Sequence, residues 1–159
     1  MVVTRFAIIV MPEPTPAQAG RLTGHVTPRA GLATVVFTWA GTDLDAAVTG
    51  ALREIELAGL RAVRVADNDW VTLMDIAGRI GRSRELVRLW SIGRTGPGGF
   101  PPPLNPGAKT TYYSWLEVAA WLRDQAGVTV AEPEPALVIA NLTVRLRSIR
   151  QQCPWPRRT

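Results

Sequence analysis

Residues 70–126 have the sequence WVTLMDIAGRIGRSRELVRLWSIGRTGPGGFPPPLNPGAKTTYYSWLEVAAWLRDQA, in which several independent signals agree on one structure. Near the start, Leu73, Ile76, Ala77 and Ile80 follow the spacing i, i+3, i+4 and i+7. This spacing places four side chains on one face of an α-helix. We therefore predict a short amphipathic helix at the beginning of the segment.

The residues at the ends of this helix are suited to capping. Thr72 is a natural N-cap, and Asp75 can interact with the positively polarised helix start. Gly81 ends the helix, since glycine tolerates positive φ, and Ser83 caps a second helix. The apolar face of that second helix consists of Leu86, Val87 and Trp90. Two short helices joined by a glycine-containing turn of about three residues form a helix-turn-helix.

The second helix leaves a charged face exposed. Its members are Ser83, Arg84, Glu85 and Arg88. They lie mostly in the first two turns of the helix, which are the turns that enter a DNA major groove, and arginine can bond two acceptors on guanine. A solvated helix face explains any single arginine equally well. For the whole set on this framework, we interpret the face as one that contacts base edges.

A different kind of segment follows Gly93. Residues 94–103 are rich in glycine and proline, which oppose helix formation. Residues 109–113 are β-branched and aromatic and predict a short strand, with Phe100 either paired opposite it or filling the core. Ser114 then caps a third helix. The inward face of that helix is formed by Leu116, Val118, Ala119, Ala120, Trp121 and Leu122.

This order of elements resembles the excisionase-like and MerR-type winged helix-turn-helix domains. The residues that carry the resemblance are Thr72, Ile76, Ala77, Gly81, Ser83, Val87, Trp90, Phe100, Pro101, Pro103, Trp115, Val118, Trp121 and Leu122. The resemblance covers about a third of the chain. It implies a unit that binds double-stranded DNA with its second helix in the major groove and its wing on the backbone or minor groove.

We expect a second set of residues to hold phosphates: Thr72, Arg82, Arg94, Lys109 and Thr110. The N-terminus of the second helix can add to this set, because its unbonded N–H groups attract anions. The sequence departs from full-length MerR-type activators, since we find neither their long dimerising coiled coil nor their ligand-binding C-terminal domain.

Composition limits the other function classes. The chain has 159 residues, 47% of them hydrophobic, and a formal charge of +5 with a pI near 10.6, which suits a partner with phosphates. Its single cysteine and single histidine, Cys153 and His25, are far apart, and no phosphate-binding or dinucleotide fingerprint is present. We expect no enzyme activity, cofactor, metal site or membrane span, and a cytoplasmic location.

The segment before residue 70 predicts a small α/β layer. We expect strands at residues 2–10, 33–39 and 60–66, a loop over 11–31, and a helix capped by Thr42 or Asp43. The predicted fold class is α+β: a winged helix-turn-helix with a small N-terminal β-β-α-β layer and a C-terminal helix. The layer, residues 1–67, could dimerise, recruit a protein or bind a small molecule, and dimerisation is the interpretation we favour.

The C-terminal region predicts a linker over 127–134, then a helix and basic tail over 135–159. In this helix the apolar residues Ile139, Leu142, Leu146 and Ile149 have heptad spacing over barely two repeats. The helix therefore packs either on its own domain or on a partner. Five basic residues follow Glu134, namely Arg145, Arg147, Arg150, Arg157 and Arg158. They add salt-sensitive attraction to DNA or form a solvated end.

Together these features predict a sequence-specific DNA-binding protein, of the bacterial transcription regulator type, that acts as a homodimer. Two other hypotheses remain open. One is an excisionase-like architectural factor that bends DNA for recombination. The other is an adaptor in which the winged fold docks a protein and does not bind DNA.

Overall fold

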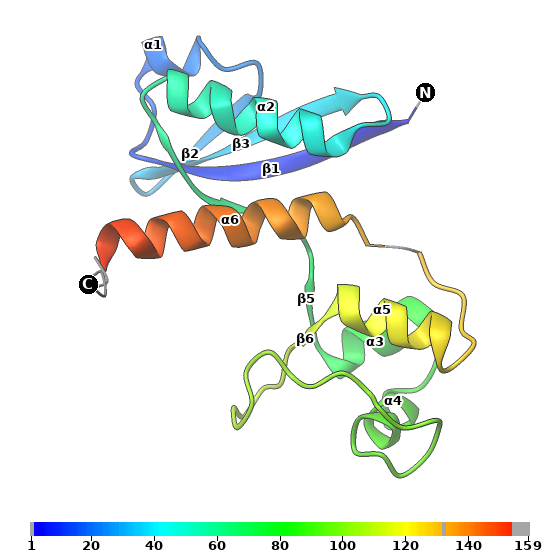
Figure 1. The fold of residues 1–159 in the computed structure, drawn as a ribbon. Helices are drawn as coiled ribbons and strands as arrows, with labels where there is room; N and C mark the ends of the chain where they lie inside the picture. Colours follow the sequence, from blue (N-terminus) through cyan, green and yellow to red (C-terminus); the bar gives the residue numbers. More distant parts are fainter. Residues whose placement is uncertain (1, 132, 154–159) are drawn as a thin grey trace, which may run out of the picture. The chain divides into compact units, whose positions relative to one another are not determined.

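The chain folds into two compact units in a computed structural model that describes residues 2–131 and 133–153 (Figure 1). The first unit comprises Met1–Asp67 and Pro135–Thr159, and the second comprises Asn68–Glu134. Each unit has its own hydrophobic core, and together they make the chain an α+β protein. No helix within the described residues combines the length and apolar character that crossing a bilayer requires.

The first unit is a four-stranded antiparallel sheet covered by helices. Its elements are β1 Val3–Met11, α1 Pro16–Ala19, β2 His25–Arg29, β3 Leu32–Ala40, α2 Leu44–Leu57, β4 Arg61–Val65 and α6 Pro135–Gln152. The strand order is β2-β3-β1-β4. Burial alternates along β1, as expected for a sheet with one covered face.

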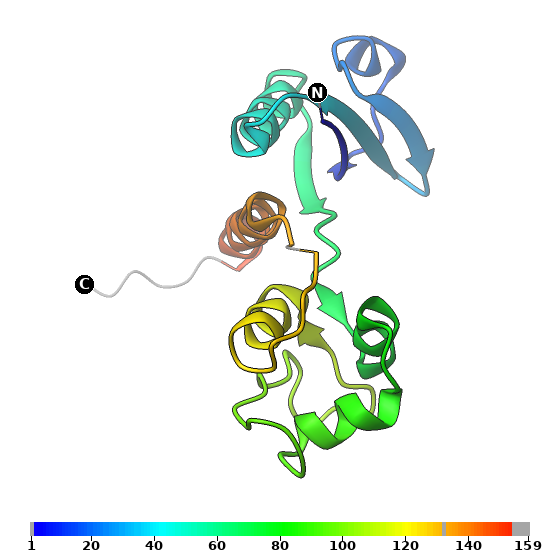
Figure 2. The ribbon, with the colours of Figure 1, turned by 90° about the vertical axis from the view of Figure 1, so that its right-hand side faces the viewer.

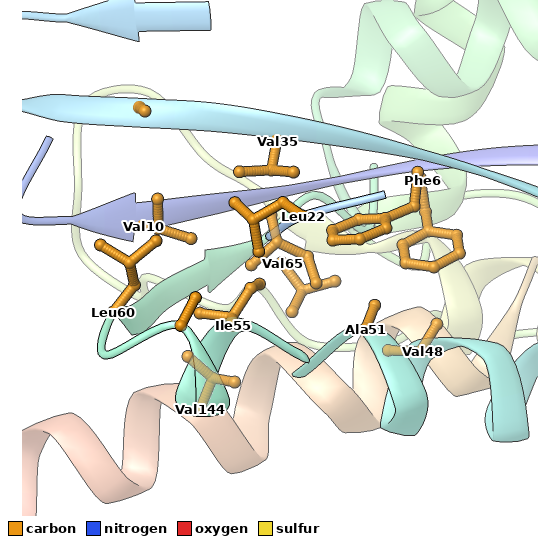
Figure 3. Close-up of a cluster of buried hydrophobic side chains, with 14 of the residues drawn as sticks. Phe6, Val10, Leu22, Val35, Val48, Ala51, Ile55, Leu60, Val65 and Val144 are labelled. Atoms are coloured by element: carbon orange, nitrogen blue, oxygen red, sulfur yellow. The ribbon is translucent and has the colours of Figure 1, made fainter. Parts of the chain in front are cut away.

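Apolar side chains from the sheet and two helices fill the space between them (Figure 3). Ile8 and Val35 contribute from the central strands, Ile55 from α2 and Val144 from α6. A hydrogen-bonded side chain also holds α6 in place. Asn141 accepts from the backbone N–H of Val65 and donates to the carboxylate of Asp67. The C-terminal helix is therefore part of the first unit.

The prediction of a loop over residues 11–31 is wrong. This segment contains the short helix α1 and the strand β2, which pairs with β3 from His25↔Val36 to Arg29↔Leu32. Proline within a run argues against a strand, but β2 lies at the sheet edge and carries Pro28 there. Ala30 and Gly31, both at positive φ, make the tight turn into β3.

The second unit is built around two short strands. Its elements are β5 Trp70–Val71, α3 Leu73–Ile80, α4 Arg84–Ser91, β6 Tyr113–Ser114 and α5 Trp115–Asp124. In Figure 2, α3 and α5 flank the two strands and α4 lies below them. The segment 127–134, which the sequence predicts as a linker, contributes Val128 and Val130 to this core.

The predicted strand over residues 109–113 is also wrong in extent. Only its last residue, Tyr113, is in a strand, and β6 pairs with β5 through Trp70↔Ser114 and Val71↔Tyr113. The strand β6 therefore pairs with β5, the two residues just before α3, and not with the segment around Phe100. Of the two roles predicted for Phe100, the structure has the second, because its ring packs edge-on against Tyr113 and Trp121.

The start of α5 is fixed by two side chains. The hydroxyl of Ser114, the predicted cap, accepts from the N–H of Glu117 at 3.4 Å. The buried Asp69 adds a second contact, since its carboxylate accepts from the N–H of Leu116 at 2.8 Å. Asp69 therefore ties the beginning of the second unit to its last helix.

Candidate functional site

The start of α3 carries a complete capping box. The Thr72 hydroxyl accepts from the N–H of Asp75 at 3.2 Å, and the Asp75 carboxylate accepts from the N–H of Thr72 at 2.8 Å. The hydroxyl of Thr72 also donates to that carboxylate at 2.9 Å. These hydrogen bonds from Thr72 hold the pKa of Asp75 below its ordinary value. The capping predicted for this pair is confirmed.

The turn after α3 depends on glycine. Gly81 has φ +65°, a left-handed conformation that a residue with a Cβ adopts at a cost. The N–H of Arg82 donates to the carbonyl of Ala77 at 3.0 Å, which closes the helix end. Ser83 then caps α4, with its hydroxyl accepting from the N–H of Leu86 at 3.2 Å. The three residues between α3 and α4 therefore reverse the chain tightly.

One face of α4 is packed against α3 and the rest of the core. Val87 is fully buried and Trp90 nearly so, in the same cluster as Ile76 and Ala77 of α3. The Trp90 ring meets Trp121 of α5 edge-on, with ring centroids 5.5 Å apart. This packing fixes which side of α4 faces outward.

The charged residues on the outward side of α4 lie at its N-terminal end, within its first turn and a half. Arg82, Ser83, Arg84 and Glu85 are exposed, and Arg88 is half-buried. Glu85 and Arg88 bond each other through two hydrogen bonds of 2.7 and 2.8 Å. The hydrogen bonds lower the pKa of Glu85 and raise the pKa of Arg88. Both charged groups are accessible to solvent, so this pair is exchanged for other partners at little cost.

Arg82 and Arg84 carry the unbalanced positive charge at this end of α4. Neither forms an ion pair or a side-chain hydrogen bond with another described residue. They stand at the N-terminus of an eight-residue helix, where unbonded N–H groups and the helix dipole favour an anion. This end of α4 combines two exposed guanidinium groups with a fixed electropositive site.

The loop after α4 is pinned to the core in its first half. The indole N–H of Trp121 donates to the carbonyl of Gly98 at 2.9 Å. Gly96, at φ +82°, lies against Trp90 so closely that a Cβ there would stand 2.6 Å from the ring. The Gly/Pro segment is therefore shaped by the two buried tryptophans. Arg94 is exposed where this segment begins.

Asn105 organises the second half of the loop. Its amide donates to the carbonyl of Thr110 and accepts from the N–H of Tyr112, both at 2.8 Å. The N–H of Leu104 also donates to the carbonyl of Tyr112 at 2.7 Å. Lys109 and Thr110 are exposed on this turn. Their side chains are presented by a turn that Asn105 closes, and not by the predicted strand.

The predicted site residues thus fall into three groups. Arg82, Ser83, Arg84, Glu85 and Arg88 are brought together at the start of α4, whereas Arg94, Lys109 and Thr110 lie on the loop. Thr72 belongs to neither group, because it caps α3. Its hydroxyl is already engaged with a carboxylate, which would repel a phosphate. The geometry therefore argues against Thr72 as a phosphate contact.

Sequence reasoning missed the residues that shape the loop. Gly96, Gly98 and Asn105 set its path, although none carries charge. The signal for Asn105 was present, since asparagine between a hydrophobic residue and Pro-Gly is a common turn former. The contact of Gly96 with Trp90 had no local signal, because it depends on the packing of α4 against α5.

Basic and acidic residues lie in different segments of the second unit. Residues 68–134 contain seven basic and seven acidic residues. Six of the basic residues and one acid, Glu85, lie between Arg79 and Lys109, which gives that segment a charge of 6 − 1 = +5. The remaining acids lie before or after it in the sequence. A unit with no net charge therefore carries a basic segment that includes α4 and the loop.

The search for relatives adds no family to these observations. Comparison with protein-family models, with curated proteins and with solved structures finds no match to this chain. Among the described residues, no group of histidine, cysteine and acidic side chains is arranged to hold a metal ion. The candidate site thus stands on its own geometry.

Proposed function

We propose that the second unit is a winged helix-turn-helix that binds double-stranded DNA in a sequence-specific manner. The observation that carries the proposal is the exposed N-terminal turn of α4, with Arg82 and Arg84 projecting from a helix whose other face is locked on α3. The resemblance to excisionase-like and MerR-type domains supports the same assignment. The segment from α4 to β6 takes the place of the wing.

The dimensions of α4 suit the major groove. An α-helix with its side chains is about 10–12 Å in diameter, and the major groove of B-DNA is about 12 Å wide, so the groove admits one helix. In this arrangement Arg84 reaches the O6 and N7 atoms of a guanine, and Ser83 with the helix N-terminus holds a phosphate. Arg88 can bind a base in one of two ways. Either it breaks its bonds with Glu85 and bonds the base instead, or it enters the groove while still bonded to Glu85.

We further propose that the protein is a transcription regulator that acts as a homodimer. One short recognition helix offers few base contacts, and proteins of this type reach useful affinity by placing two such helices on successive half-sites. The first unit, with its exposed edge strand β2, is the part of the chain available for association. Lys109, Thr110 and Arg94 add phosphate contacts that carry no sequence information.

The test begins with selection of bound sites from a pool of random duplexes. Affinity for the selected site and for a scrambled duplex is then compared between wild type and Arg84→Ala/Arg88→Ala. We expect the double variant to bind the selected site more weakly by about 1–3 kcal/mol for each base contact, and to discriminate less between the two duplexes. Arg123→Ala is the matched control, since it removes one arginine from α5 of the same unit.

Lys109→Ala separates the role of the loop from that of α4. Removing a phosphate-binding cation there should weaken both duplexes by the same factor and reduce the dependence of affinity on salt by about one unit of slope. If Arg84→Ala/Arg88→Ala bound the selected duplex as tightly as wild type, α4 would not be the recognition helix. If no duplex were selected at low salt, the proposal of DNA binding would be wrong.

A further inference from the structure

The C-terminal helix α6 has apolar residues on two opposite faces. Its inner face packs on the first unit through Leu137 and Val144, with Asn141 hydrogen-bonded between them. These residues occupy positions c and f of a heptad in which Ile139 is position a. A helix that is apolar all round normally has both faces covered. In α6, the core of the first unit covers only the inner face.

The outer face of α6 is the stripe that the sequence predicts. Ile139, Leu142, Leu146 and Ile149 occupy positions a, d, a and d, and 58%, 57%, 47% and 56% of their surface is exposed. Four large aliphatic side chains in one row are unusual on a surface, where single exposed apolar residues are the rule. This row, which we call the α6 seam, has the spacing of a helix that pairs with another helix.

The charged residues of α6 that flank the α6 seam are all positive, whereas Asp45 and Glu56 of α2 line the groove beside Ile139 at its N-terminal end. Arg145 and Arg150 stand at the flanking positions g and e, and no acidic residue lies between Pro135 and Gln152. The third arginine of the helix, Arg147, is at position b and faces Glu56 of α2 at 3.7 Å. Residues at e and g determine which partner a paired helix accepts. The α6 seam therefore favours a partner with acidic flanks.

A second copy of α6 does not have that chemistry. In a parallel pair of α6 helices, Arg145 of one copy would face Arg150 of the other, because position g meets position e five residues further along the partner. In an antiparallel pair the flanks would again offer only arginines, since α6 has no other ionisable group. Like charges across a helix pair disfavour it.

The surface widens at the C-terminal end of the α6 seam. There Arg145 and Ile149 line a groove of about 480 Å³ together with Met11, Leu32 and Val63 from the sheet. Side chains that extend from a helix seated on the seam can enter this groove. An apolar row, two flanking arginines and an adjacent apolar groove thus form one continuous surface of the first unit.

We propose that α6 docks an acidic amphipathic helix of another protein, with leucine-like residues on the α6 seam and carboxylates against Arg145 and Arg150. The surface lies in the first unit and uses none of the residues of the second unit that we assign to DNA, although Arg145 and Arg150 belong to the basic C-terminal set. This role is independent of the proposed DNA binding, and each is tested separately.

The probe is a fluorescent synthetic peptide of about three heptads, with leucine at a and d and glutamate at e and g. Fluorescence anisotropy of this peptide with the full chain should show saturable binding that weakens as salt is raised. Leu142→Ser/Leu146→Ser should reduce the affinity at least about tenfold, equivalent to about 1.4 kcal/mol. Serine is chosen because it adds no charge that could itself repel the peptide.

A charge exchange tests the choice of partner. Arg145→Glu/Arg150→Glu should weaken binding of the glutamate peptide by at least about tenfold and strengthen binding of the same peptide with lysine at e and g. Gln151→Glu is the matched control, because it adds a carboxylate at position f of the same helix. It should bind the glutamate peptide as wild type does. Circular dichroism of each variant establishes that α6 remains folded.

Three results would overturn the proposal. The first is the absence of binding by the folded wild-type chain, or binding that ignores the charge exchange. The second is a dimer in sedimentation that Leu142→Ser/Leu146→Ser converts to a monomer, since a second copy would then cover the seam. The third is a large loss of thermal stability in that same variant without a change of mass, which would show that the chain covers the seam itself.

Discussion

Replacing Gly96 by alanine should destabilise the second unit through two separate effects. Gly96 has φ +82°, and an alanine held there costs about 1–2 kcal/mol in backbone strain. Its Cβ would also stand 2.6 Å from Cδ1 and 2.9 Å from Nε1 of Trp90. That ring is held in place by burial and by Trp121, so it cannot turn aside. Overpacking of this kind adds about 1–3 kcal/mol.

Gly98→Ala is the matched control for this variant. Gly98 has nearly the same backbone conformation, φ +78°, but an added Cβ would meet nothing within 4 Å. It should therefore show the backbone cost of about 1–2 kcal/mol alone. The difference between the two variants isolates the contact with Trp90, and we expect it to be about 1–3 kcal/mol.

Urea unfolding followed by tryptophan fluorescence measures both variants on the relevant unit. The signal is dominated by that unit, since it contains Trp70, Trp90, Trp115 and Trp121. Equal losses of unfolding free energy for Gly96→Ala and Gly98→Ala would refute the close packing of the loop on Trp90. A Gly96→Ala variant as stable as wild type would refute the positive φ as well.

Three further predictions concern other parts of the chain. The lowered pKa of Asp75 means that its bonds with Thr72 stabilise the fold above the ordinary carboxyl range and are lost as the pH falls through the lowered pKa. The unfolding temperature of Asp75→Asn should thus fall less on acidification than that of wild type. Asn141→Ala should lower the unfolding free energy by about 1–3 kcal/mol in a urea titration, because it removes two part-buried hydrogen bonds, one from the N–H of Val65 and one to the carboxylate of Asp67. Glu85→Gln should bind a scrambled duplex more tightly in an anisotropy assay at fixed salt, since it removes an anion and releases Arg88.

Local signals predicted the helix ends of the second unit well. Thr72, Gly81, Ser83 and Ser114 cap helices as their residue types indicate, because a cap is a contact with atoms only two to four residues away. The exposed face of α4 was predicted for a similar reason, because assigning Val87 and Trp90 to the buried face fixes which residues of the helix face outward. These features of the candidate site were therefore available from the sequence.

Features that depend on contacts with residues distant in the sequence were not predicted. Residues 109–113 have strand-forming side chains, but the chain supplies a pairing partner only for Tyr113, in β5. The strand β2 was hidden by Pro28, which is acceptable only because β2 became an edge. For α6 the sequence analysis identified one apolar row, from Ile139 to Ile149, but the sheet and α2 bury the opposite face through Leu137 and Val144.

The distribution of charge in the second unit limits how many DNA phosphates one copy can neutralise. Between Arg79 and Lys109 there are six basic residues and one acid, Glu85, so this segment offers a net charge of about +5 to phosphates. Each neutralised phosphate contributes about −0.9 to the slope of log affinity against log salt, which bounds a single unit at about −4.5. A steeper measured slope requires cations from elsewhere, either from the first unit or from a second copy. Because the remaining residues of the second unit are mostly acidic where they are charged, they would oppose a wider contact with the duplex. If the second unit binds DNA as proposed, tight binding therefore requires cations from the first unit or from a second copy to a greater degree than the overall charge of +5 suggests.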